Sequence, residues 1–231
     1  MKKTTEKLTG LVLGVLLVWS WSLTTEAGTI TVEHDGTSLD MDFTQIGSPG
    51  NTADTDTGYG SVSYKYEIGT YEVSINQWNT ATQDWSNWGN TNGSPWSGDQ
   101  PVSQVRFFQA AMFANWLTSG DPSQGAYDIA VPEVTIDREA AIGVYGLGNV
   151  FVVPTIDEWY KAAYYNPSAG AYADYPTGSN TAPPPTAGST TAGEAVYDGQ
   201  SAPAVVDFAG GLSPFGTMAQ GGNVNEFIEV D

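Results

Sequence analysis

The sequence has 231 residues and a formal net charge of −19, because 26 Asp and Glu residues face only 7 Lys and Arg. So acidic a chain has few cations to offer phosphates, which excludes nucleic acid as a partner. With no cysteine, the chain can form neither disulfides nor zinc–thiolate sites. Its single histidine, His34, is the one residue that could act as the base of a Ser–His–Asp triad.

The N-terminus has the order of a secretory signal peptide. Three lysines precede an apolar stretch over residues 8–23, and small residues follow up to Ala27. The alternative is an uncleaved membrane anchor, but a stretch of about 16 residues is shorter than the ~20 that a spanning helix needs. We therefore expect a signal peptide over residues 1–27, a secreted or extracytoplasmic protein, and no membrane insertion after cleavage.

Short alternating segments follow the signal peptide. Residues 28–40 are predicted as an N-terminal strand segment that includes the run 29–34, in which His34 is interpreted as a surface residue rather than a base. The domain proper is predicted over residues 41–231, with a strand at 41–46. Apolar residues alternate again over residues 61–73, which predicts a further strand there.

The sequence predicts three helices, near residues 75–84, 106–118 and 156–165. The first begins at a capping box formed by Ser74 and Gln77, and the third at one formed by Thr155 and Glu158. The middle helix is indicated by apolar side chains at helical spacing. The Trp-rich polar stretch ending at residue 100 and the segment 170–193 are predicted as loops, so the fold class is α+β and loop-rich.

Four segments of the chain occur in the order found in one known family. They are Tyr66–Ser74, Pro101–Leu117, Val152–Trp159 and Gly222–Phe227. On these segments the chain resembles the formylglycine-generating enzyme, or sulfatase-modifying factor, family. The resemblance implies a single domain with a C-type-lectin-like fold, here apparently truncated at its C-terminus.

The activity that the resemblance implies is copper-dependent oxidation of a substrate cysteine to formylglycine by a pair of cysteines downstream of the last segment. Because the chain has no cysteine, no catalytic or cofactor-binding residue is assigned and copper is not expected. Two functions stay open. One is an exported family member that is not catalytic as written, and the other is a non-catalytic, lectin-like module that binds a surface glycan or peptide.

The Trp-rich stretch bears on the second function. Trp85, Trp88 and Trp96 could stack on a sugar or peptide, or fold inward to anchor their loop. A third interpretation, a glycosidase with paired carboxylates, has only the abundance of acidic residues behind it.

The resemblance also implies structural calcium. Carried over to this chain, one site would use the carbonyl oxygens of Gly222 and Val224 and the side chain of Glu226, whereas a further family ligand falls on Ala219, which has no side-chain oxygen. The alternative is a turn whose polar groups bond only the backbone. Residues 54–58 imitate the start of a calcium-binding loop, but a polar turn is the favoured interpretation there.

Overall fold

The computed structural model describes residues 17–18, 28–83, 85, 95–129, 133–198 and 200–229. Its main element is a five-stranded sheet in the order β2-β3-β4-β1-β7, in which every neighbouring pair is antiparallel. The strands are β1 (Leu17–Val18), β2 (Gly28–His34), β3 (Thr37–Ile46), β4 (Tyr66–Gly69) and β7 (Phe151–Val152). Strand β1 lies inside the predicted signal peptide, and β3 runs through position 40.

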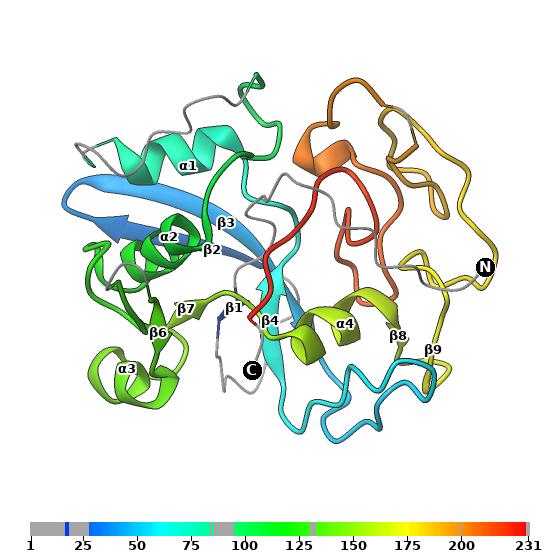
Figure 1. Cartoon of the computed structure of the whole chain (residues 1–231), viewed down its shortest axis with the longest axis horizontal. Helices are drawn as coiled ribbons and strands as arrows, with labels where there is room; N and C mark the ends of the chain where they lie inside the picture. The colour runs from blue at the N-terminus through cyan, green and yellow to red at the C-terminus, as the bar shows by residue number, and fades with distance from the viewer. Residues whose placement is uncertain are drawn as a thin grey trace.

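Four helices accompany the sheet: α1 (Ile75–Thr82), α2 (Phe107–Ser119), α3 (Arg138–Tyr145) and α4 (Ile156–Tyr164). Figure 1 shows α1 and α2 beside the long β2–β3 hairpin in one half of the molecule. The other half is mostly irregular chain from the segment after α4. None of the described helices is long and apolar enough to cross a membrane.

The remaining regular structure is short. Strands β5 (Tyr127–Asp128) and β6 (Thr135–Ile136) form one two-stranded sheet, strands β8 (Tyr165–Asn166) and β9 (Ala171–Tyr172) form another, and η1 (Val206–Phe208) is a single 3₁₀ turn. The last described residues cross the middle of the molecule and pair with the start of α4 through a parallel bridge between Thr155 and Glu229. The molecule is thus an α+β, loop-rich domain, as the sequence predicts.

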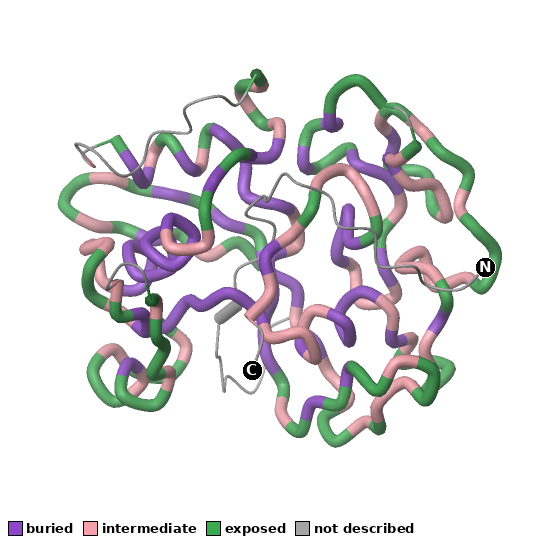
Figure 2. The backbone as a smooth tube through the Cα atoms, in the orientation of Figure 1, coloured by how far each residue is buried: buried purple, intermediate pink, exposed green. Residues whose placement is uncertain are grey.

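The core lies between the sheet and the first two helices. Trp78 of α1 stacks on Phe113 of α2 with ring centroids 5.2 Å apart, and both side chains are fully buried. Figure 2 shows buried residues along β3, α2 and β7, and a further buried stretch along α4. Burial of aromatic rings on this scale supplies most of the favourable free energy of folding.

Both predicted capping boxes are confirmed. The Ser74 side chain accepts a hydrogen bond from the backbone N–H of Gln77, whose side chain accepts one from the Ser74 backbone. Thr155 and Glu158 form the same reciprocal pair at the start of α4. These boxes satisfy N–H groups that the first turn of a helix leaves without partners.

The predicted strand over residues 61–73 is too long at both ends, since only Tyr66–Gly69 form β4. Residues 61–65 are irregular, because the carbonyl of Val62 accepts from Gly50 N at 2.8 Å and its N–H donates to the side chain of Asn51. The backbone is therefore bonded to the preceding loop instead of a neighbouring strand. Helix α3 is a second departure, since the sequence analysis contains no helix there; it begins at the N-cap Asp137, which accepts from Ala140 N.

A buried ion-pair network joins α3 to α4 and to the end of the described chain. The guanidinium of Arg138 lies 3.0 Å from the Glu158 carboxylate and 2.7 Å from that of Glu229. Tyr64 donates a further hydrogen bond to Glu158, and Tyr127 donates one to Glu229. Each of these carboxylates therefore has a cation and at least one neutral donor, the arrangement in which burial of charge is tolerated.

Candidate metal centre

Glu72 is a buried carboxylate in the segment that connects β4 to α1, and its side chain is 1% exposed. Its Oε2 accepts a hydrogen bond from Asn223 Nδ2 at 2.5 Å, and its Oε1 accepts one from the backbone N–H of Val224 at 3.2 Å. Asn223 has a φ of 60°, in the left-handed region that asparagine tolerates better than most residues. The loop after residue 219 is thus fastened to Glu72, far earlier in the chain.

Glu226 comes from the same loop and turns toward α4. Its Oε2 accepts a hydrogen bond from the indole N–H of Trp159, and its Oε1 accepts one from Gln220 Nε2 at 3.3 Å. The capping box at Thr155 fixes where α4 begins, and this places Trp159 on the turn that faces Glu226. The capping box at the start of α4 therefore fixes the position of Trp159 beside Glu226.

The two carboxylates repel each other, and no ion pair to either is found within the described ranges. Burial raises the pKa of Glu72 to about 8, against the opposing effect of its hydrogen bonds from Asn223 and Val224. Burial likewise raises the pKa of Glu226 well above its ordinary value, and the charge of Glu72 adds to that rise. Among the described residues, the ion pairs of Arg138 go to other carboxylates. Neutral donors alone leave this pair uncompensated.

These groups fit a hard divalent cation. Calcium takes six to eight oxygen ligands. The two carboxylates are oxygen ligands of the kind it prefers, and the resemblance adds the carbonyl oxygens of Gly222 and Val224 from the same loop. The amide oxygen of Gln220 is buried there and has no hydrogen-bond partner. The described part of the chain contains no group of three His, Cys, Asp or Glu side chains arranged for a metal, so any such site must use carbonyl and amide oxygens.

The predicted ligands share one loop in the structure. Gly222 and Val224 are half-buried and flank Asn223, and Glu226 follows two residues later. Glu72 is absent from the predicted set, although it belongs to the Tyr66–Ser74 motif. No local pattern marks it, because its partner Asn223 is 151 residues away.

The other candidate, the loop at residues 54–58, is a turn. The backbone N–H of Gly58 bonds the carbonyl of Asp54 at 2.7 Å, and the Asp54 side chain accepts from Asp56 N and from the hydroxyl of Tyr160. The carboxylate therefore has neighbours from its own turn and from α4. This arrangement matches the polar turn that the sequence analysis favours.

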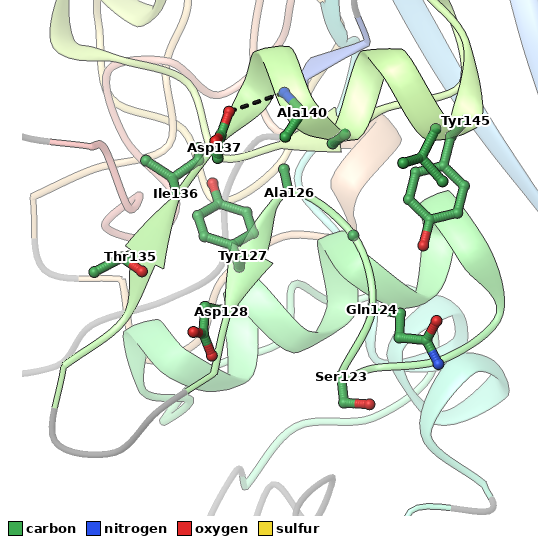
Figure 3. A pocket seen from close by; sticks show the side chains of 13 residues that line it. Ser123, Gln124, Ala126, Tyr127, Asp128, Thr135, Ile136, Asp137, Ala140 and Tyr145 are labelled. Atoms are coloured by element: carbon green, nitrogen blue, oxygen red, sulfur yellow. Dashed lines mark hydrogen bonds between the residues drawn. The ribbon is translucent and has the colours of Figure 1, made fainter.

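A cavity of about 580 Å³ lies elsewhere, between α3 and the β5–β6 sheet. Figure 3 shows Asp137 at the start of α3, bonded to Ala140 N, and Tyr127 on the opposite strand. Neither Glu72 nor Glu226 lines it. The cavity is therefore separate from the carboxylate pair.

Another cavity, of about 330 Å³, lies at the tip of the β2–β3 hairpin. Its walls include Trp85 and Trp116, and its polar groups include His34, Asp35 and Gln83. The imidazole of His34 packs edge-on against Trp116, with centroids 5.3 Å apart. His34 is thus half-buried instead of lying freely on the surface.

Of the three tryptophans in the Trp-rich stretch, Trp85 and Trp96 pack against the core. Trp85 also contacts Trp78 edge-on, at 6.2 Å between centroids. Trp88 lies outside the described residues. The inward alternative of the sequence analysis therefore holds for Trp96, whereas Trp85 packs against the core and also lines the cavity at the hairpin tip.

Comparison with known proteins adds one finding. The model of a family described as sulfatase-modifying factor enzyme 1-like domain matches residues 24–230. No curated protein and no solved structure matches the chain. The match covers the β2–β3 hairpin, all four helices and the carboxylate pair.

The uncompensated carboxylates predict a pH dependence of stability in EDTA. A raised folded-state pKa means that the native state holds a proton that the unfolded state loses above about pH 4.3. The free energy of unfolding should therefore fall as the pH rises from about 4.3 toward about 8, by up to about 1.4 kcal/mol per pH unit and per carboxyl. Urea titrations at several pH values measure it.

The matched variants are Glu72→Gln and, as a control, Glu33→Gln on the exposed face of β2. Glu72→Gln should remove part of the slope, and Glu33→Gln should leave it unchanged. An identical slope in the protein and in Glu72→Gln would contradict the prediction.

Proposed function

The chain belongs to the family of sulfatase-modifying factor enzyme 1-like domains, and on this premise we propose that it is an exported, calcium-stabilised member that does not itself oxidise a substrate cysteine. The observation that carries the proposal is the absence of cysteine from all 231 residues. Copper oxidation of a thiol needs soft ligands that hold Cu(I), and thiolate is the ligand that best suits it. One histidine and isolated thioethers do not replace a thiolate pair.

Export is supported by the first residues of the chain. Lys2, Lys3 and Lys7 precede the apolar stretch, and the small residue Ala27 precedes Gly28. Strand β2 begins at Gly28, directly after the expected cleavage position. Cleavage would remove β1 from between β4 and β7.

The proposed role of calcium is structural. Glu226, with the carbonyl oxygens of Gly222 and Val224, would hold the ion, and Glu72 would add a second negative charge beside it. The bound ion supplies the positive charge that these buried carboxylates lack. In doing so it would fasten the last described loop to α4 through Trp159 and to the segment before α1 through Glu72.

A second function, binding of a neutral glycan, is favoured by the cavity at the hairpin tip. Trp85 offers a half-buried aromatic wall, and Asp35 and Gln83 are polar groups at its rim. Gln83 Nε2 donates to Thr37 Oγ1 at 2.8 Å, so the rim is ordered before any ligand arrives. Aromatic walls with a few fixed polar groups are typical of small-ligand sites, and the acidity of the chain disfavours anionic sugars.

We expect no formylglycine formation by this chain. The purified protein would be incubated with a cysteine-containing sulfatase peptide, copper and reductant, and the aldehyde measured by mass spectrometry. A family enzyme with the cysteine pair serves as the positive control. Turnover clearly above a sample without protein would overturn the proposal, because it would require a ligand set other than thiolate.

We expect the exported protein to begin at Gly28. N-terminal sequencing of material recovered outside the cytoplasm of the expressing cell measures this directly. An intact Met1 on the exported protein would refute cleavage, and retention of the whole chain in the cytosol would refute export.

We expect Trp85→Ala to lower the affinity for a neutral oligosaccharide at least tenfold if the second function is correct. The apolar face of a sugar buried on an indole is worth about 25 cal/mol per Å², and a tenfold change corresponds to about 1.4 kcal/mol. Calorimetry against a panel of neutral hexose and N-acetylhexosamine oligosaccharides provides the measurement. Phe208→Ala, at an exposed aromatic outside the cavity, is the control. No binding by any member of the panel would exclude this function.

A further inference from the structure

Strand β1 lies inside the main sheet, between β4 and β7, although its residues belong to the predicted signal peptide (Figure 1). Its two residues, Leu17 and Val18, pair antiparallel with both neighbouring strands. Among the described residues, no other strand pairs with both β4 and β7. Strand β1 therefore joins the β2-β3-β4 part of the sheet to β7.

The backbone groups of β7 that face β1 follow from the bonds of their neighbours. The N–H of Phe151 donates to Thr118 Oγ1 of α2 at 2.9 Å, and so does not bond β1. The N–H of Val153 donates to the hydroxyl of Tyr127 at 2.8 Å. Successive residues of a strand point their N–H and C=O groups to opposite sides. Those of Val152, between the other two, therefore point toward β1.

The same alternation applies to β4. The N–H of Thr70 donates to the carbonyl of Asp42 on β3 at 2.8 Å. The backbone groups of Ile68, two residues earlier, therefore also face β3, and those of Glu67 face β1. With β1 in place, Val152 is 1% exposed and Glu67 is 9% exposed. Strand β1 thus supplies backbone partners to two buried residues.

Cleavage before Gly28 would remove β1 from the exported protein. The space between β4 and β7 (the strand slot) would then be two strand spacings wide, about 9.6 Å, which one extended strand fills. The N–H and C=O groups of Val152 and Glu67 would lose their partners. Buried backbone groups without partners are disfavoured, so the slot favours a strand that restores these bonds.

Contacts that do not involve the signal peptide hold both sides of the strand slot. The hydroxyl of Tyr66 on β4 donates to the carbonyl of Glu158 in α4, the helix that follows β7. The rings of Phe43 on β3 and Phe151 on β7 have centroids 5.8 Å apart. The bond to Thr118 ties β7 to α2 as well. A site that is formed in advance binds at a lower entropic cost than one that must first be ordered.

We propose that the exported protein binds an extended aliphatic segment of a second polypeptide in the strand slot, antiparallel to β4 and β7. Leu17 and Val18 show which kind of segment the slot accepts, and backbone hydrogen bonds supply the affinity in strand addition of this kind. A second copy is a poor donor, because every strand described after Gly28 is already paired in its own sheet. The inference rests on the proposed cleavage and adds a peptide-binding site to the exported protein.

The probe is a fluorescent synthetic peptide with the sequence of residues 15–20, extended by lysines at both ends for solubility. Fluorescence anisotropy compares its binding to two forms of the protein. One is the exported protein, and the other is the whole chain made in a cell-free system without membranes, which keeps residues 1–27. The exported protein should bind at least tenfold more tightly, because β1 fills the slot of the whole chain.

Two controls separate strand addition from nonspecific attraction of a basic peptide to an acidic protein. A peptide of the same charge, N-methylated at the positions of Leu17 and Val18, lacks the two donors and should bind at least tenfold more weakly. In the whole chain, Val18→Pro removes a donor of β1 and should open the slot to the probe. Ser22→Pro lies outside β1 and should not. Both variants leave the sequence from Gly28 onward unchanged.

The outcomes distinguish this inference from the proposed export. If the exported protein keeps residues 1–27, the proposed cleavage fails and the strand slot fails with it. If the protein begins at Gly28 and binds the probe no better than the N-methylated peptide, cleavage stands and the strand slot is refuted. A mass of two chains by light scattering, without probe binding, would put a second copy in the slot and also overturn the proposal.

Discussion

The hydrogen bonds from Asn223 and Val224 to the buried carboxylate of Glu72 close the domain. They join the segment before α1 to the last described loop, and the irregular chain after α4 lies between these anchor points in sequence. Regular secondary structure is sparse in the segment after α4. Side-chain hydrogen bonds therefore hold this segment in place, as backbone hydrogen bonds between strands do in the sheet. Removal of the carboxylate would release the loop that carries the candidate ligands.

Two carboxylates near α4, the buried Glu158 and the half-buried Glu226, have different partners. Glu158 is fully buried, but Arg138, Tyr64 and its own capping bonds compensate it. Glu226, bonded to the adjacent residue Trp159, has only neutral donors. Helix α4 thus carries one carboxylate, Glu158, that is paired with a cation, and its next residue, Trp159, contacts another, Glu226, for which the described residues supply neutral donors alone. This contrast supports the calcium proposal at Glu226 rather than at Glu158.

The starts of α1 and α4 could be predicted because their capping residues lie close together in sequence. The carboxylate pair could not, because its residues are far apart in sequence. Ser74 with Gln77, and Thr155 with Glu158, lie three residues apart, so the bonds that fix α1 and α4 can be seen in the sequence. Residues 61–65 alternate like a strand, yet their backbone bonds a neighbouring loop, which alternation cannot reveal. The loop ligands follow from the family motif. Glu72 and Gln220 do not, because their significance depends on burial and on partners that only the folded chain brings together.

The separation of 151 residues between Glu72 and Asn223 also governs when the protein can fold. Contacts so distant in sequence form slowly, because a long loop of chain must close before they contribute. During synthesis, Glu72 is made 151 residues before Asn223, so the bond between them cannot form until both segments are present. Closure of the domain at Glu72 therefore follows the helix and hairpin contacts, which join residues that are close in sequence.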